Sequence, residues 1–281
     1  MARRFSAPYQ SEPVSSLANW SRNLAIFSVV AVVVSILIVR FGFLEMKPAL
    51  ATFFGALGCA VLSILVGLAA FAAIWQNGSR GMGRILLAFL ISTVLLAYPA
   101  YLALQFRKLP KIYDITTDPI DPPRYDALSR LRPRDANPIA YSGLYAAEQQ
   151  RKAYPDVGPL ATNATPQAAY DAALAVVNKR RWRVVDARAP QAGRREGHIE
   201  AVARTPIMGF REDISIRITP DGEESRVDIR SSSRYFESDL GSNAARVSKL
   251  IEDINSAVDN AKPAQKKPQT PAKLQAKTVK K

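Results

Sequence analysis

The chain has 281 residues, 48% of them hydrophobic, and a formal net charge of +14. A single cysteine excludes an internal disulfide and a thiolate metal cluster, and a single histidine excludes a multi-histidine metal site and argues against a Ser/His/Asp triad. The charge is uneven, at +8 for residues 1–111, −1 for residues 112–261 and +7 for residues 262–281. A nucleic-acid groove needs a basic face on the folded domain, so nucleic acid is not expected as a partner.

After a polar tail at residues 1–22, three long apolar stretches fill residues 23–106. They are bounded by Arg or Lys and run over Asn23–Val39, Ala49–Trp75 and Ile85–Phe106. A membrane-spanning helix needs about 20 apolar residues. The first stretch is short, and it reaches that length by continuing past Arg40 if this side chain extends to the headgroups. No small-residue cleavage site follows before Arg40, so we expect an uncleaved helix rather than a signal peptide.

The composition of these stretches limits what they can do. None has a charged or strongly polar residue in its interior, which argues against a channel or transporter path. Lys and Arg divide five to five between the two sides of the membrane, so their distribution does not set the orientation. The small residues Ala51, Gly55, Gly58 and Gly67 either allow close helix packing or simply reflect the usual composition of spanning helices.

Residues 107–164 are predicted to be a semi-rigid arm outside the packed core. Asp-Pro steps and a Pro pair favour extended or turn conformations, with a short helix around Leu144–Ala153. Asp114, Asp118 and Asp121 lack the Gly and bidentate Glu of a calcium loop, so they are read as turn residues. No metal site or cofactor is predicted for this chain.

Residues 165–260 predict a compact α+β domain, which makes the fold class membrane-anchored α+β. Thr165-Pro166 opens a helix that runs to about Lys179, and a second helix runs from about Leu240 to Val258 with Ser238 or Asp239 as its cap. Four alternating runs between the helices predict strands, at Arg183–Arg188, Glu196–Thr205, Asp213–Thr219 and Ser225–Ser233. We expect a roughly four-stranded antiparallel sheet with both helices on one face and a charged, water-exposed second face. Residues 261–281 are predicted to be a disordered Lys-rich tail, either solubilising or in contact with anionic lipid.

Several stretches resemble the domain-of-unknown-function family numbered 1499 over about residues 109–258. They are YDITTDPIDPP (113–123), NPIAYSG (137–143), YPDVGPL (154–160), HIEAVARTPIMGF (198–210) and RVDIRSSSRYFESDLGSNAARV (226–247). The resemblance implies a small α+β domain, often membrane-tethered or exported, and no particular activity. It favours an inner-membrane protein with its N-terminus inside and its domain in the periplasm. The family's usual glycine after Ser233-Arg234 is replaced in Tyr235-Phe236, which disfavours a tight turn there.

The candidate site lies on the last strands and the start of the last helix, where arginines and a helix N-terminus favour an anionic group. Its residues are Arg217, Arg226, Asp228, Arg230, Ser231, Ser233, Arg234, Asp239 and Asn243. The alternative is a structural lattice of cross-strand ion pairs with a helix cap, which needs no ligand. His198 is expected on the polar face with Glu200, and Trp182 is expected to fill the core.

Two functions remain open on the sequence alone. The first is a binding or scaffolding module at the cell envelope, with membrane lipids and an envelope protein, anionic lipid or glycan as partners. The second is an envelope hydrolase that uses Asp228 or Asp239 with Arg230 and Ser231. The oligomeric state does not follow from the sequence.

Overall fold

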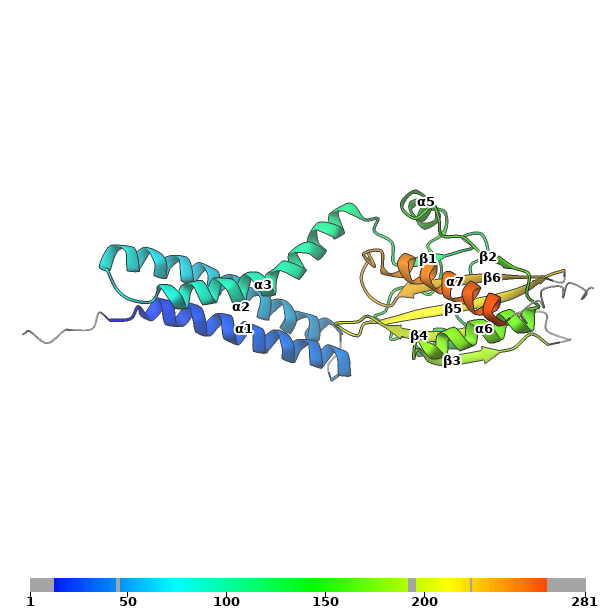
Figure 1. Cartoon of the computed structure of the whole chain (residues 1–281), viewed down its shortest axis with the longest axis horizontal. Coiled ribbons are helices and arrows are strands. Elements are labelled where there is room, and N and C mark those ends of the chain that lie inside the picture. Colours follow the sequence, from blue (N-terminus) through cyan, green and yellow to red (C-terminus); the bar gives the residue numbers. More distant parts are fainter. Residues whose placement is uncertain (1–12, 44–45, 192–195, 223, 262–281) are drawn as a thin grey trace, which may run out of the picture.

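The computed structural model describes residues 13–43, 46–191, 196–222 and 224–261. These residues form a bundle of three long helices, followed by an α+β domain that lies against one end of the bundle (Figure 1). The predicted disordered tail at residues 261–281 lies outside the described residues except for Ala261, which ends the last helix. Of the predicted N-terminal tail, only residues 13–22 are described.

The bundle consists of three helices that are long and apolar enough to cross a membrane: α1 (Ser16–Phe41), α2 (Met46–Asn77) and α3 (Met82–Lys108). The first helix begins before the predicted start at Asn23 and carries Arg22 within it, so it is not a short span. α1 ends in a left-handed Gly42, and residues 13–15 pair with Arg80 in the turn between α2 and α3. The bundle therefore has its N-terminus and the α2–α3 turn at one end and the α1–α2 turn at the other.

Polar and small residues join α1 to α2 inside the bundle. The hydroxyl of Ser21 donates to the carbonyl of Ser63 at 2.9 Å, and that of Ser63 donates to the carbonyl of Ser21 at 2.8 Å. A Cβ atom added at Gly67 would lie 2.6 Å from the Phe89 ring. Gly55 and Gly58, by contrast, have no neighbour within 4 Å of such an atom. Of the three glycines in α2, Gly67 is therefore the one at which a neighbouring helix approaches closely.

The domain has an antiparallel sheet of six strands, larger than the four expected. In chain order its elements are β1 (Asp114–Thr116), α4 (Ala127–Leu131), α5 (Gly143–Ala153), β2 (Leu160–Thr162), α6 (Pro166–Lys179), β3 (Arg183–Arg188), β4 (Gly197–Arg204), β5 (Arg211–Asp221), β6 (Glu224–Ser233) and α7 (Ser242–Ala261). The strand order is β1-β6-β5-β4-β3, and β2 also pairs with β6. The predicted strands correspond to β3–β6.

The two extra strands come from the predicted arm, so its expected exclusion from the core is wrong. β1 pairs with residues 230–232 of β6, and β2 pairs with residues 225–227 of the same strand. Ile112, Ile115 and Ala146 are buried in the hydrophobic core of the domain. Strands of three residues are too short to show an alternating pattern, and prolines flank them, which is why the sequence pattern did not predict them.

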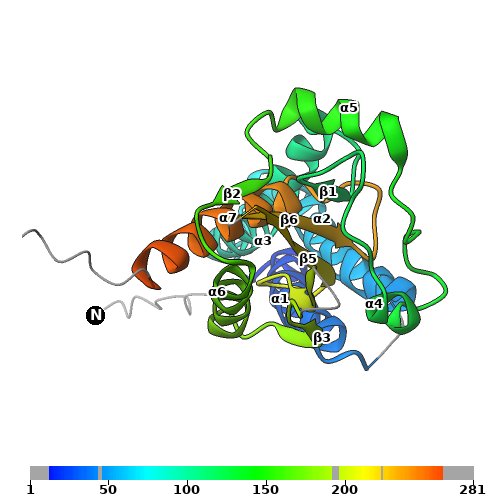
Figure 2. The same cartoon turned by 90° about the vertical axis from the view of Figure 1, so that its right-hand side faces the viewer.

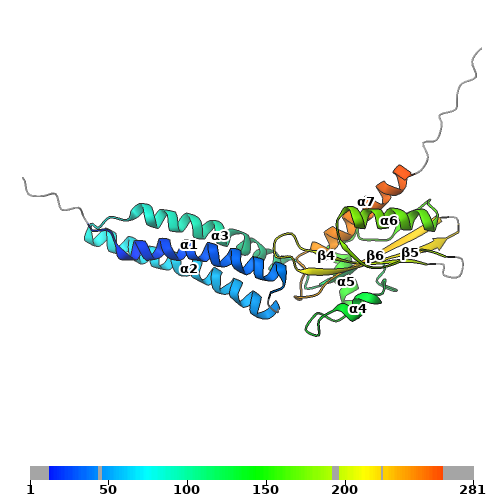
Figure 3. The same cartoon turned by 90° about the horizontal axis from the view of Figure 1, so that it is seen from below.

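The helices α6 and α7 cover one face of the sheet, as expected, while α4 lies on the other (Figures 2 and 3). Ile214, Ile216 and Ile218 of β5 point toward the two helices and are fully buried. Ala173 and Val177 of α6 and Leu250 and Ile254 of α7 pack on them. Burying this much apolar surface supplies the main favourable free energy of folding. The alternation that fills this core also directs every second side chain of β4–β6 to the opposite face.

Candidate functional site

The polar face of the sheet is covered rather than open to water, which corrects the expectation of a wetted face. Residues 117–141, which follow the edge strand β1 and contain α4, lie across it (Figure 2). Asp213, Ser215 and Asp228 on this face are at most 1% exposed. Arm carboxylates and backbone carbonyls bind the arginines of the sheet, and these contacts offset the cost of removing the charged side chains from water.

Arg230 of β6 is one of two almost fully buried arginines on this face, the other being Arg234. Its guanidinium donates to Asp114 through Nε–Oδ1 at 3.0 Å and Nη2–Oδ2 at 2.6 Å. It also donates to the carbonyl of Ile139 and lies over the ring of Tyr125, with 4.6 Å from Cζ to the centroid. Burial raises the pKa of the Asp114 carboxyl, and the two bonds from Arg230 oppose that rise. These neighbours fill the space around the ion pair with protein.

Arg217 and Arg226 share a second cluster with Asp228. Nη2 of Arg217 lies 3.2 Å from Asp228, and Nε of Arg226 lies 3.1 Å from the same carboxylate. The arm adds Asp118, which contacts both arginines, and Asp121, which contacts Arg217 at 2.6 Å. The arm aspartates that were read as turn residues are therefore also the ion-pair partners of the sheet.

Arg234 forms a third buried cluster at the end of β6 nearer the bundle. It binds Asp213 through two nitrogens, the shorter distance being 2.7 Å, and Arg132 binds the same carboxylate at 2.6 Å. The hydroxyl of Tyr125 donates to the backbone carbonyl of Asp213 at 3.0 Å. Together the three clusters hold the arm on the sheet, which is the structural ion-pair lattice considered as the alternative to an anion site.

The remaining candidate residues lie on the opposite, helix-covered side of β6. Ser231 donates to Asn243 at 2.8 Å, and Asn243 donates to Ser233 at 2.9 Å. Asp239 caps α7 by accepting from the backbone N–H of Asn243 at 2.6 Å, and burial raises the pKa of its carboxyl. The structure therefore splits the nine predicted residues into two groups separated by the sheet. Arg230 and Ser231, which the hydrolase hypothesis combines, point to opposite faces.

A further group of titratable side chains lies at the start of α4. Ligand atoms of Asp126, His198 and Glu200 lie within 4.8 Å of one another, the spacing of a metal site. The Glu200 carboxylate, however, already accepts from the backbone N–H groups of Asp126 and Leu128, each at 2.7 Å. Burial alone would raise the pKa of Glu200, but hydrogen bonds from His198 and from this backbone outweigh it and lower the pKa. Both oxygens of the carboxylate accept backbone hydrogen bonds, so Glu200 acts as a cap for α4.

The turn after Arg234 keeps a conformation typical of glycine. Phe236 stands where the family usually has glycine, and its φ is +72°. Its ring packs edge-on against Phe210, with 5.2 Å between the centroids. The chain therefore bends here with Phe236 in a conformation that favours glycine, and an aromatic contact accompanies the strained backbone.

The domain contacts the bundle directly at Arg40, the last basic residue of α1. Its Nη1 donates to the carbonyls of Pro206 and Ile207, at 2.8 Å and 3.3 Å, in the loop between β4 and β5. A Cβ atom added at Gly209 of that loop would lie 3.1 Å from Cγ of Arg40. The contact therefore lies at one end of a helix that is long and apolar enough to cross a membrane.

Beside this contact is a cavity of about 440 Å³ whose lining is strongly basic. Its arginines are Arg40, Arg180, Arg181, Arg183, Arg204, Arg211 and Arg234. Arg180 and Arg234 are neutralised by Asp253 and Asp213. The other five are exposed and have no carboxylate within 4.0 Å among the residues the structure describes. We call Arg181, Arg183, Arg204 and Arg211 the junction arginines.

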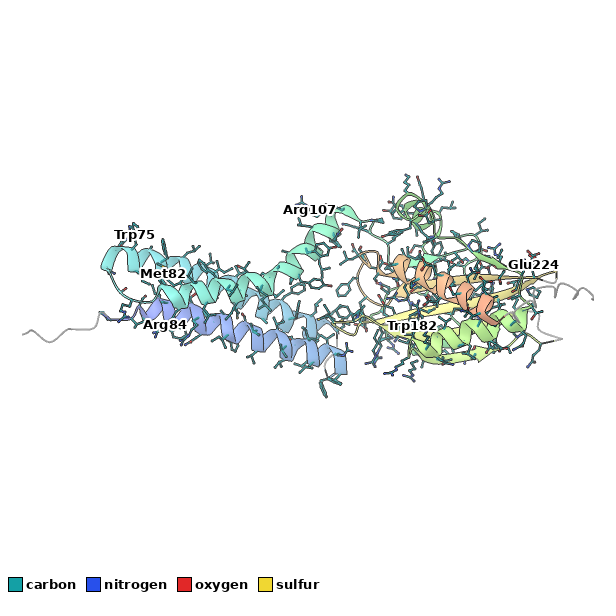
Figure 4. The ribbon with its side chains drawn as sticks, viewed as in Figure 1. Trp75, Met82, Arg84, Arg107, Trp182 and Glu224 are labelled. Atoms are coloured by element: carbon teal, nitrogen blue, oxygen red, sulfur yellow. The ribbon has the colours of Figure 1, made fainter. Side chains whose placement is uncertain are left out.

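Figure 4 places Trp182, another lining residue, at the end of the domain that faces the bundle. A second cavity, of about 570 Å³, adjoins the first on the side of the α1–α2 turn and shares Arg40, Arg211 and Arg234 with it. Reasoning from the sequence missed this region. The run Lys179–Arg183 (KRRWR) was a usable signal, but Arg204 and Arg211 join it only through the pairing of β4 with β5.

A family model described as "Protein of unknown function (DUF1499)" matches residues 114–254, half of the chain. The chain therefore belongs to this family, as its sequence motifs suggested. The matched segment begins at β1 and ends within α7, so it includes the Pro-rich arm as part of the family domain. The comparison with curated proteins found no match to the chain.

Proposed function

We propose that this protein is a membrane-anchored binding module, in which the spanning helices hold a rigid domain against the membrane surface and the junction arginines bind an anionic ligand. The observation that carries the proposal is the set of exposed arginines around the cavity at the bundle–domain junction. Elsewhere in the domain the described arginines of the sheet are ion-paired, as Arg217 and Arg230 are, so the junction is where positive charge stays available.

The direct contact between domain and bundle supports a scaffolding role as well. A domain on a flexible linker would sample many orientations, whereas Arg40 ties the β4–β5 loop to the end of α1. The three helices and the domain thus present one fixed surface to the headgroup layer. Candidate partners for that surface are membrane lipids, an anionic glycan or another envelope protein.

The competing hydrolase finds less support in the geometry. Asp228 contacts Arg217, Arg226 and Thr117 on the arm-covered face of the sheet. Ser231 lies on the opposite, helix-covered face, where it donates to Asn243. A nucleophile, its base and a charged stabiliser need to reach one reacting atom. The sheet keeps these residues apart.

One experiment separates binding from hydrolysis. In a strain that lacks the gene, we compare the charge-reversed variant Arg181→Glu/Arg183→Glu with Ser231→Ala, after checking that both full-length proteins are membrane-inserted and resist protease. Loss of complementation by the charge-reversed variant alone is the expected result. Loss by a folded Ser231→Ala variant, with the charge-reversed protein still active, would favour the hydrolase.

The proposal places the protein in the inner membrane with its N-terminus inside and its domain in the periplasm. Family resemblance supports this orientation. Fusions of alkaline phosphatase and of a fluorescent protein after Val258 test it, because the phosphatase is active only outside the cytoplasm. A fluorescent, phosphatase-negative result would move the domain to the cytoplasm and leave the binding proposal intact.

A further inference from the structure

We infer that the junction arginines form a binding site for the phosphate of an anionic phospholipid headgroup from the surrounding leaflet. The inference rests on the proposed binding function and names its ligand. It follows from four features of the junction: the position of the cavity, the arrangement of charge, the choice of arginine and the nature of the remaining lining.

The position of the cavity brings it level with the headgroups. Arg40 lines it and is followed after one residue by Gly42, which ends α1, so the cavity begins where the apolar helix stops. The third helix also ends on this side, at Lys108, and Arg107 marks that end in Figure 4. Lipid phosphates lie just outside the hydrocarbon core, which is about 30 Å thick.

The arrangement of charge calls for a counter-anion. Arg204 of β4 and Arg211 of β5 are direct cross-strand partners in the register of the sheet. Like charges in that arrangement repel and destabilise the pair. Arg183 of the neighbouring β3 pairs with Val202, two residues before Arg204, and Arg181 stands in the preceding turn with a left-handed φ of 55°. A bound phosphate would relieve this repulsion, since no carboxylate among the described residues forms an ion pair with these arginines.

The choice of arginine fits phosphate rather than a general attraction to the membrane. The planar guanidinium presents paired N–H donors that match two oxygens of one phosphate, whereas a lysine offers a point charge. All basic residues that line the cavity are arginines. A surface evolved only for loose contact with an anionic leaflet needs no such uniformity.

The rest of the lining suits the glycerol end of a lipid. Trp182, Val185 and Val202 add an aromatic and an aliphatic surface beside the arginines. Tryptophan is enriched at membrane interfaces, where its ring meets the glycerol region. A cavity of about 440 Å³ falls within the range of small-ligand sites and accommodates a headgroup with its glycerol.

The test uses the full-length protein in nanodiscs of phosphatidylcholine that contain phosphatidylglycerol as a minor, anionic component. The protein is then extracted in mild detergent, and the lipids that remain bound are measured by mass spectrometry. The variant is Arg181→Gln/Arg204→Gln/Arg211→Gln. The matched control, Arg151→Gln/Lys152→Gln/Lys249→Gln, removes the same charge from α5 and α7. Each basic residue near the surface increases the affinity for anionic lipid about fivefold. We therefore expect the variant, which lacks three of them, to bind phosphatidylglycerol on the order of 100-fold more weakly.

Inorganic phosphate serves as the second probe, followed by the fluorescence of Trp182 in a Trp20→Phe/Trp75→Phe background. Enrichment of phosphatidylglycerol that disappears in the variant and persists in the control supports the inference. Equal enrichment in variant and control overturns it. Arginine-dependent binding of free phosphate without lipid enrichment also overturns it, but leaves the proposed binding function standing. Binding of neither probe by a folded protein whose complementation still depends on the arginines overturns the inference and indicates a different ligand for the same site.

Discussion

Arg230 and Asp114 form a buried two-point ion pair between β6 and β1, with 2.6 Å between Nη2 and Oδ2. The two residues are 116 positions apart in the chain, and both are at most 4% exposed. Their contact attaches the segment that follows the membrane bundle to the centre of the domain. The guanidinium of Arg230 is therefore engaged within the fold and is not free to bind a ligand.

Replacing Arg230 by Ala is expected to lower the free energy of unfolding by about 3–5 kcal/mol, because the Asp114 carboxylate is left buried without its partner. The change is measured by unfolding the full-length protein in detergent with urea, with protease resistance as the readout of the folded fraction. Arg226→Ala is the control. Arg226 is 42% exposed and Asp228 keeps Arg217, so its loss should cost no more than about 1 kcal/mol. Equal costs for the two variants would contradict the structural role of the Arg230 pair.

The cap formed by Glu200 predicts a dependence of stability on pH. Hydrogen bonding lowers the pKa of Glu200 below its usual 4.5, so the stabilisation is fully present above pH 4.5 and is lost as the pH falls through the folded-state pKa. Glu200→Gln should therefore cost about 1–3 kcal/mol at neutral pH and less in acid. The exposed Glu252→Gln should change stability by less than about 0.5 kcal/mol throughout. A Glu200→Gln cost that stays constant from neutral to acid pH would refute this explanation.

The left-handed backbone at Phe236 predicts an unusual order of substitutions. Both Phe236→Ala and Phe236→Gly lose the contact with Phe210, but only glycine relieves the strain at φ +72°. The glycine variant should be the more stable of the two by about 1 kcal/mol. At the next residue, Glu237, φ is not positive, so Glu237→Ala should be at least as stable as Glu237→Gly. Thermal unfolding of the four variants in detergent measures their stabilities. A higher unfolding temperature for Phe236→Ala than for Phe236→Gly would contradict the left-handed conformation at this position.

Gly67 predicts a packing defect within the bundle. A methyl group there meets Phe89 and Ser21 at less than 3.0 Å, so Gly67→Ala should destabilise the contact among the helices by about 1–3 kcal/mol. Gly58→Ala has open space and should be neutral or slightly favourable, since alanine is the better helix former. Rates of proteolysis in detergent report on the difference. If both variants are equally stable, close approach of the helices at Gly67 is not required.

The strongest sequence patterns predicted their elements well. Apolar length predicted the three helices, and period-two alternation predicted β3–β6 with α6 and α7 on one face. Of the two residues proposed as the cap of α7, Asp239 accepts from the backbone N–H of Asn243, although the helix begins at Ser242 rather than near Leu240. These features depend on local spacing, which a single sequence displays. The family motifs likewise identified the domain, which the match over residues 114–254 shows.

What the sequence determined by itself was the existence and type of the long elements, because hydrophobic length and period are written into consecutive residues. Only the tertiary structure decided that Asp114, Asp118 and Asp121 cover the sheet, since their arginine partners lie about 100 residues away and no local pattern links them. It also decided that Ser231 and Arg230 face opposite ways from one strand. The junction arginines came together for the same reason: strand pairing and the docking of Arg40 place residues from four segments around one cavity.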